Sequence, residues 1–240
     1  MKLTITLPSI HGHALQRTLE NIRDTTVGDH EVIVVSPNEP PFIGNITTFV
    51  KDVVLEGANA GHAQALHYAR GDFIFPWVDD HLLVKGWDGV LLEEFLEREK
   101  EHQFFVMGAR NAPHVGTVFG IYYPYFPLMR REWAVQTGWF DAAYRCGFAD
   151  ADLALRVWQT GGHCEWSNKW DDQRIIKGHL DDGRKGSAPN TTDLDTNLFL
   201  TRWYPIFGAG WQTADLRDYN RDVIPEPSRK SYSPDRRRLY

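Results

Sequence analysis

Short apolar runs alternate with amphipathic segments over the first half of the chain, and this alternation limits the possible folds more than any other feature. Residues 3–7 and 31–35 are apolar runs rich in β-branched residues, as strands are. Between them, Leu15, Leu19 and Ile22 recur at the spacing of one face of a helix. Strand and helix in alternation predict βαβ units, so we expect an α/β fold with a mostly parallel central sheet flanked by helices.

The alternation continues along the chain. Two prolines among β-branched and aromatic residues indicate that residues 115–129 form strands, or a wall with loops, and not a helix. An apolar stripe, with Asp152 and Arg156 able to pair across an exposed turn, favours a helix that begins near Asp150. The other predicted elements are strands at 53–55, 73–78 and 104–107, a helix over 60–70 capped by Asn59, a helix capped by Asp88, and a helix around 193–204.

Composition excludes several classes of protein. A chain of 240 residues with 42% hydrophobic content can bury the core of one domain, and its net charge of −6 argues against a protein that wraps nucleic acid. Cys146 and Cys164 lack the paired spacing of a disulfide framework or a thiolate zinc site. No run reaches the roughly 18 apolar residues of a membrane span, and the first residues lack a signal-peptide pattern, so we expect a cytoplasmic protein without a transmembrane segment.

The C-terminus differs in charge from the rest of the chain. Residues 217–240 contain more Lys and Arg than Asp and Glu. We therefore interpret residues 206–240 as a basic C-terminal extension. Its positive charge suits phosphates, an anionic membrane surface or an acidic acceptor, and a solvated terminus is the alternative.

An acidic and imidazole cluster, Asp79-Asp80-His81, directly follows the predicted strand 73–78. Ligands of an open parallel sheet collect beyond the carboxyl ends of its strands. In an extended chain Asp79 and His81 share one side, where both reach one cation, and Asp80 points away. A carboxylate and an imidazole suit Mn²⁺ better than Ca²⁺. The alternative is an acidic turn that forms a loop or caps a helix.

Asp150 marks the start of the helix in the segment GFADADLALRVWQTGG, residues 147–162. Acidic residues there, including Asp152, are ordinarily explained by capping and by the helix dipole. The functional alternative is a carboxylate that accepts a proton from a hydroxyl nucleophile, a step worth roughly 10²–10⁴ in rate.

Over roughly residues 3–187 the sequence resembles the inverting GT-A glycosyltransferases of family 2. The matching segments are a strand that ends in Pro8-Ser9, EGANAGHAQALHYARGDFIFPWVDDH (56–81) and LMRREWAVQTGWFDAAYRCGFADADLALRVWQTGG (128–162). The last of these is the most specific. Asp79-x-His81 stands where the family has Asp-x-Asp, and it is similar to the Asp-x-His motif of the polypeptide N-acetylgalactosaminyltransferases, in which Asp and His bind Mn²⁺.

The resemblance implies a GT-A domain over residues 1–205, with a donor half at about 1–110 and an acceptor half at about 111–205. It also implies roles for single residues. Asp150 occupies the position of the catalytic base, with Ala149 in place of the usual Glu, and His179 suits a further metal ligand, although a lone His is more often an ordinary surface or core residue. The implied metal ligands are Asp79, His81 and His179; the implied donor contacts are Pro8, Ser9, Ser36, Asn38, Asn59, Gly61, Asp80 and Trp139.

Three of these donor contacts leave alternatives open. Ser36 and Asn38 stand where relatives carry an Asp that contacts the base, so the nucleotide stays open. Trp139 is suited to stack on a sugar, and a buried core aromatic is an equal alternative.

The sequence therefore predicts a metal-dependent inverting glycosyltransferase that uses Mn²⁺ or Mg²⁺ to bind a nucleotide-diphosphate sugar. The acceptor is a glycan, a lipid-linked molecule, a protein or a modified nucleic acid. One alternative is a nucleotidyltransferase, but residues 8–15 lack its Gly-rich phosphate loop. The other is a catalytically inactive module that binds nucleotide sugars.

Overall fold

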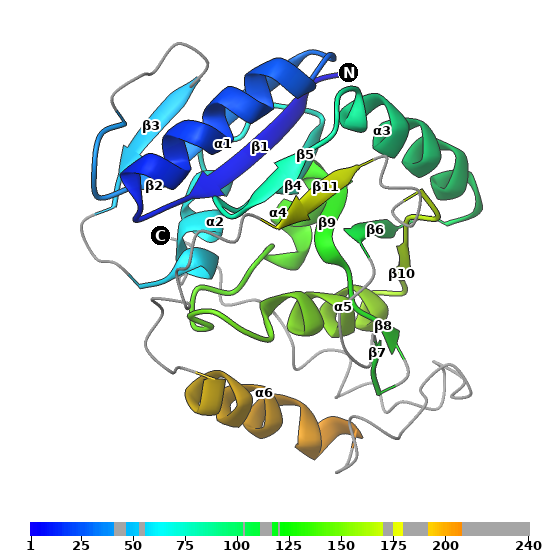
Figure 1. Ribbon diagram of the computed structural model, residues 1–240. Coiled ribbons are helices and arrows are strands. Elements are labelled where there is room, and N and C mark those ends of the chain that lie inside the picture. Colours follow the sequence, from blue (N-terminus) through cyan, green and yellow to red (C-terminus); the bar gives the residue numbers. More distant parts are fainter. Residues whose placement is uncertain are drawn as a thin grey trace.

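The computed structural model describes residues 1–40, 47–52, 56–102, 104–110, 117–119, 121–169, 175–179 and 192–207 (Figure 1). In chain order the elements are β1 (Leu3–Pro8), α1 (Gly12–Thr25), β2 (His30–Ser36), β3 (Thr48–Lys51), α2 (Ala58–Leu66), β4 (Phe73–Pro76), β5 (His81–Leu83), α3 (Trp87–Arg98), the 3-10 helix η1 (Glu99–Glu101), β6 (Phe105–Arg110), β7 (Thr117–Val118), β8 (Ile121–Tyr122), β9 (Tyr125–Arg130), α4 (Arg131–Thr137), α5 (Ala149–Gln159), β10 (His163–Trp166), β11 (Ile176–His179) and α6 (Thr192–Phe207).

Seven strands form one central sheet in the order β10-β6-β9-β4-β1-β2-β3. All neighbouring strands are parallel except β9, which runs antiparallel to β4 and β6. The carboxyl ends of β1, β2 and β4 therefore lie at one edge of the sheet. The predicted α/β fold with a mostly parallel sheet is confirmed.

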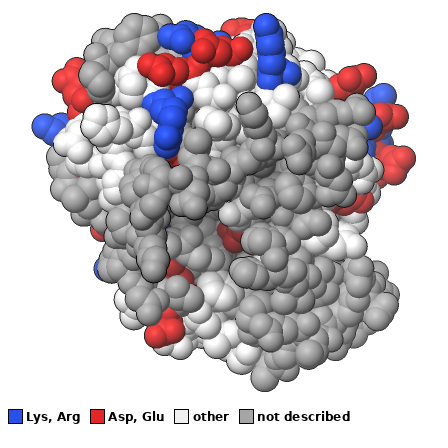
Figure 2. Space-filling view, in the orientation of Figure 1, with Lys and Arg blue, Asp and Glu red and all other residues white. Residues whose placement is uncertain are grey.

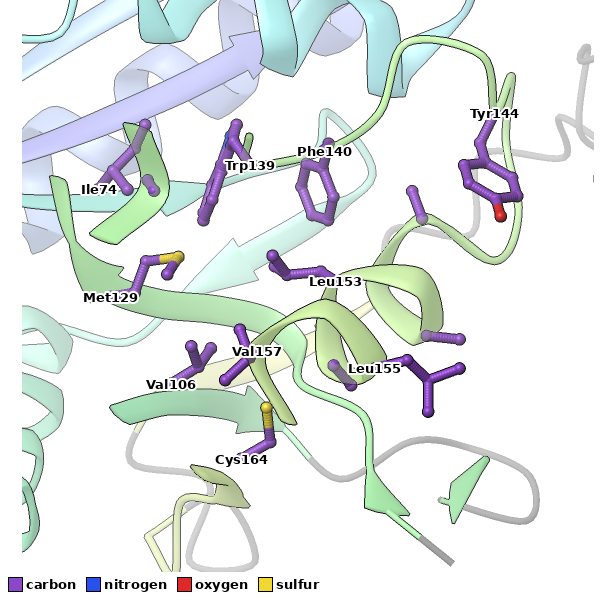
Figure 3. Packing of buried hydrophobic residues seen from close by; sticks show 14 of the residues in the cluster. Ile74, Val106, Met129, Trp139, Phe140, Tyr144, Leu153, Leu155, Val157 and Cys164 are labelled. Atoms are coloured by element: carbon purple, nitrogen blue, oxygen red, sulfur yellow. The ribbon is translucent and has the colours of Figure 1, made fainter. Parts of the chain in front are cut away.

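Helices cover both faces of the sheet and bury a hydrophobic core on each. In β2, Val32 and Val34 belong to the core beneath α1 and α3, whereas Ile33 and Val35 belong to the core beneath α2, α4, α5 and α6. A strand buried on both faces is a continuous apolar run, which is why residues 32–35 do not alternate with polar residues. In the second core, residues of α5 such as Leu153 and Val157 pack against sheet residues such as Met129 (Figure 3).

One predicted boundary differs from the structure, and another predicted element lies outside the described residues. The third strand is β3, and the strand expected at residues 53–55 lies outside the described residues. Asn59 was expected to cap a helix over 60–70, but α2 starts at Ala58 after Gly57, whose φ of 107° requires glycine, and ends at Leu66. The Asn59 side chain therefore lies inside the first turn and does not cap the helix.

Two acids expected at helix surfaces are buried instead. Asp88 was predicted to cap α3, but its carboxylate accepts the backbone N–H groups of Val27 and Gly28 and so links α3 to the loop before β2. Asp152 and Arg156 do form an ion pair, at 2.7 Å, yet both side chains are buried and not exposed as predicted. Their polar groups need partners because they are shielded from water.

The last described helix, α6, extends to Phe207 and so passes the predicted domain boundary at residue 205. Residues 208–240, which hold the basic extension, lie outside the described residues. None of the helices in the described part of the chain is both long enough and apolar enough to span a membrane.

Candidate functional site

A hydrogen bond joins two predicted site residues at the carboxyl edge of the sheet. Ser9, which follows β1, donates its hydroxyl to Asp79 Oδ2 at 2.5 Å, and Asp79 follows β4. Thr18 of α1 donates to the backbone oxygen of Asp79 at 3.1 Å. Since β1 and β4 are adjacent parallel strands, their ends meet here, as the sequence predicted.

Asp80 and His81 form an acid and imidazole pair. Residues 79 and 80 make a turn, and β5 begins at His81. Asp80 Oδ1 lies 2.6 Å from His81 Nδ1, so the prediction that Asp80 points away from His81 is wrong. The prediction assumed that residues 79–81 are extended, but residues 79 and 80 form a turn, so neighbouring side chains do not alternate in direction. The His81 ring is buried and meets Phe126 edge-on.

A second, two-stranded sheet brings His179 beside His81. Strands β5 and β11 are antiparallel, and His179 is paired with His81 in their register. Nearly 100 residues separate these strands in the sequence, and the pairing places the backbone of the predicted third ligand opposite that of the predicted second ligand.

Helix α2 packs closely on the end of β1 and brings Asn59 to the same edge. A Cβ at Gly61 would lie 2.6 Å from Cβ of Pro8, so glycine permits this approach. Asn59 is 7% exposed, and its Nδ2 has no hydrogen-bond partner among the described residues. A buried amide without a partner costs stability, so this nitrogen is available to a ligand.

Replacing Gly61 by alanine is expected to destabilise the chain by about 1–3 kcal/mol, because the new methyl group overlaps Pro8. Gly89 in α3 is the matched control. An added Cβ there meets no described atom within 4 Å, so Gly89→Ala should stabilise by about 0.5–1 kcal/mol. Urea unfolding of both variants measures the difference, and a Gly61→Ala chain as stable as wild type would contradict the close packing.

Ser36 and Asn38 lie at the end of β2, next to β1. Ser36 is buried, and its hydroxyl accepts the backbone N–H of Asn38 at 3.2 Å. Asn38 itself is exposed. The turn thus leaves the Asn38 side chain accessible at the carboxyl edge of the sheet.

Asp150 lies in the first turn of α5, two residues after Phe148, the residue before the helix, whose φ is 62°. Burial raises the pKa of Asp150 to about 6, and the backbone N–H of Ala151, donated at 2.9 Å, acts against this effect. The bond to Ala151 fits the alternative of a helix-start acid. Burial, followed by the charge of Asp150, also raises the pKa of Tyr123 to about 12, which places that phenol near the carboxylate.

Helix α6 fixes the loop before α5, which sequence reasoning missed. The buried carboxylate of Asp195 accepts the backbone N–H groups of Arg145, Cys146 and Gly147 at 2.8–2.9 Å. The backbone oxygen of Arg145 would lie 2.3 Å from a Cβ at Gly57, so this loop touches the start of α2. An Asp near a helix start carries no sequence signal of such a distant contact.

Trp139 belongs to the hydrophobic core. It is 0% exposed and packs on Phe140 at 4.9 Å between the centroids of their rings (Figure 3). A fully covered ring offers no face to a sugar, so this placement favours the core alternative.

Of the predicted site residues, Ser9 and Asp79 thus lie together at the carboxyl edge of the sheet, with Asp80 and His81 directly after Asp79, whereas Trp139 lies in the core. Asp79 contacts Ser9, His81 contacts Asp80, and Phe126 at the start of β9 packs on both Tyr125 and His81. In the face shown in Figure 2, acidic side-chain atoms are visible within a hollow near the middle.

The sequence matches no protein-family model and no curated protein sequence. Its structure, however, resembles solved glycosyltransferases. TarS of S. aureus, residues 1–349, is 14% identical with a TM-score of 0.52, over 73% of this chain and 60% of that one. The mannosyltransferase PcManGT from Pyrobaculum calidifontis, solved with GDP-Man and Mn²⁺, is 15% identical with a TM-score of 0.55, over 69% of this chain and 54% of that one.

This chain therefore spans a little over half the length of these proteins. TarS 1–349 solved with UDP-GlcNAc is similar to the same degree, at 13% identity and a TM-score of 0.51 over 76% of this chain and 61% of that one. At such identities the likeness establishes the fold, and the chain has the α/β fold of these GT-A-like glycosyltransferases.

Proposed function

We propose that the chain is a metal-dependent inverting glycosyltransferase, which moves a sugar from a nucleotide-diphosphate sugar to an acceptor hydroxyl. The observation that carries the proposal is the arrangement at the carboxyl edge of the sheet. There Asp79 is bonded to Ser9 at the end of β1, and His81 lies opposite His179 in the β5–β11 ladder. The fold shared with TarS and PcManGT supports the assignment.

The residues at this edge fit a divalent cation. Carboxylate and imidazole donors suit Mn²⁺, and Mg²⁺ is the alternative. An imidazole that binds a metal commonly holds a carboxylate through its other ring nitrogen, and the 2.6 Å contact between Asp80 and His81 Nδ1 has this form. Asp79, His81 and His179 would hold the ion, and Asp80 would orient His81. When bound, the cation neutralises charge on the departing nucleoside diphosphate.

Asp150 is the proposed base. It accepts the proton of the acceptor hydroxyl while the hydroxyl oxygen bonds to the anomeric carbon and the nucleoside diphosphate leaves from the opposite face, which inverts the configuration. A carboxylate must be ionised to accept a proton. With a pKa of about 6, Asp150 is mostly ionised at neutral pH, and it is more basic than an ordinary Asp.

The donor half supplies the contacts to the nucleotide sugar. Nδ2 of Asn59, which has no partner among the described residues, would donate a hydrogen bond to the nucleotide sugar, and the accessible Asn38 would contact the nucleobase. Pro8, Ser9, Ser36 and Gly61 shape the floor between them, since Gly61 packs on Pro8 and Ser36 turns the chain toward Asn38. Mostly neutral groups recognise the nucleobase by hydrogen bonding.

A thermal-shift screen of the full chain with UDP-, GDP- and dTDP-sugars, each with Mn²⁺ or with EDTA, tests the proposal. One donor class at about 100 times its Kd should add about 2.7 kcal/mol of stability, only when Mn²⁺ is present. Asp79→Ala should abolish this dependence on Mn²⁺. A nucleotidyltransferase would respond to nucleoside triphosphates instead. If no sugar nucleotide changes Tm, with or without Mn²⁺, the proposed function is wrong.

A further inference from the structure

A second group of metal-type side chains lies at the opposite edge of the sheet. His102 lies three residues before the start of β6, and His163 and Glu165 lie in β10, the edge strand paired in parallel with β6 (Figure 1). All three are partly exposed. The amino ends of β6 and β10 meet here, whereas Asp79 and Ser9 follow the carboxyl ends of their strands, so this group is separate from the candidate active site.

The backbone holds the three side chains together. His163 and Glu165 are two residues apart in one strand, so they share a face of the sheet. The backbone N–H of His163 donates to the oxygen of Phe104 at 2.8 Å, which fixes the start of β10 beside the segment that carries His102. One ligand atom from each of the three side chains lies within 4.8 Å of the others. In tetrahedral zinc sites neighbouring ligand atoms are about 3.3 Å apart, so small side-chain movements close the difference.

We propose that His102, His163 and Glu165 bind a Zn²⁺ ion, with water as the fourth ligand. Two imidazoles and one carboxylate form a donor set that suits zinc. Arg98 supplies an outer partner, because its Nη1 donates to Glu165 Oε2 at 2.7 Å and leaves Oε1 toward His163 Nε2, 2.9 Å away. Such outer hydrogen bonds orient metal ligands.

One side-chain movement accompanies zinc binding. The rings of His102 and His163 are stacked, with centroids 4.2 Å apart and planes 15° apart. A metal lies in the plane of the imidazole that binds it, so one ring must turn about its Cβ–Cγ bond. The His163 side chain is 40% exposed, which leaves room for this rotation. The bound ion would tie the edge strand β10 to the segment before β6.

Titration calorimetry of ZnCl₂ into the untagged full chain tests this site. The Asp79→Ala/His81→Ala double variant removes the candidate active-site ligands and should still bind zinc. His102→Ala and His163→Ala should each weaken zinc binding by more than about 100-fold, since even loss of an outer partner costs about 10–100-fold. His30→Ala is the matched control, because His30 bonds to Gly28 and lies outside the group.

Thermal melts without zinc show whether the single variants are folded. Because both rings are partly exposed, we expect wild-type melting curves. Unchanged zinc affinity in His102→Ala and His163→Ala, or loss of binding in the double variant, would overturn the proposal. Neither outcome depends on whether the chain transfers sugars.

Discussion

Replacing Asp150 by asparagine is expected to lower the rate of sugar transfer by roughly 10²–10⁴-fold and, at neutral pH, to raise Tm. Asparagine has the same shape and still accepts the N–H of Ala151, but it cannot take a proton from the acceptor. It also removes a buried charge. Donor binding, measured by the Mn²⁺-dependent thermal shift, should stay unchanged because Asp150 is assigned to the acceptor side.

The pH dependence follows from the same carboxyl. Its pKa is about 6 in the folded chain, against 3.8 for an unperturbed Asp in an unfolded one, so the folded state binds more protons between these values. Stability contributed by this group is therefore lost as the pH rises from about 4 to about 6, and Asp150→Asn should remove that loss. The transfer rate should change oppositely, falling as the pH drops below about 6. A variant that keeps wild-type turnover would refute the base assignment.

Replacing Asp152 by alanine is expected to destabilise the chain by about 3–5 kcal/mol, because it leaves buried charge without a partner. Burial acts to raise the pKa of Asp152, but the charges of Arg156 and Arg202 lower it overall, so the carboxylate is ionised. Its oxygens accept hydrogen bonds at 2.7–3.0 Å from Tyr144, Arg156, Arg202 and Trp203.

Urea unfolding measures this loss. Asp24→Ala is the control, since Asp24 pairs with Arg23 on the exposed surface, where an ion pair is worth about 0–1 kcal/mol. Equal stability of the Asp152→Ala and Asp24→Ala chains would show that the buried network does not hold α6 to α5. The destabilisation expected for Asp152→Ala would also loosen α5, the helix that carries Asp150.

Short-range sequence pattern predicted β2 and α1. The strand predicted at residues 31–35 is β2, and Leu15, Leu19 and Ile22, which recur at helical spacing, are buried residues of α1. Ligand chemistry predicted an acid and imidazole cluster at a strand end, and the resemblance added Ser9. The contact between Ser9 and Asp79 arises because parallel strands place their carboxyl ends together.

The parts that the sequence did not predict depend on contacts between distant residues. Strands β5 and β11 are too short to show the alternation of polar and apolar residues that indicates a strand. They also pair across nearly 100 residues of sequence. Asp195 and Asp88 look like ordinary acids at helix starts, yet each accepts backbone N–H groups of a distant loop. The exposed pairing predicted for Asp152 was wrong because α6 covers that turn.

Residues 79 and 81 are proposed to hold the cation with which this chain cleaves a nucleotide-diphosphate sugar, and the roles proposed for the other donor-binding residues depend on that cation. The most direct test is the release of nucleoside diphosphate from the donor chosen by thermal shift, with Mn²⁺, from wild type and from the Asp79→Ala/His81→Ala chain. We expect release by wild type that stops in EDTA and in the double variant. Equal release by both chains, or release of nucleoside monophosphate, would contradict the claim.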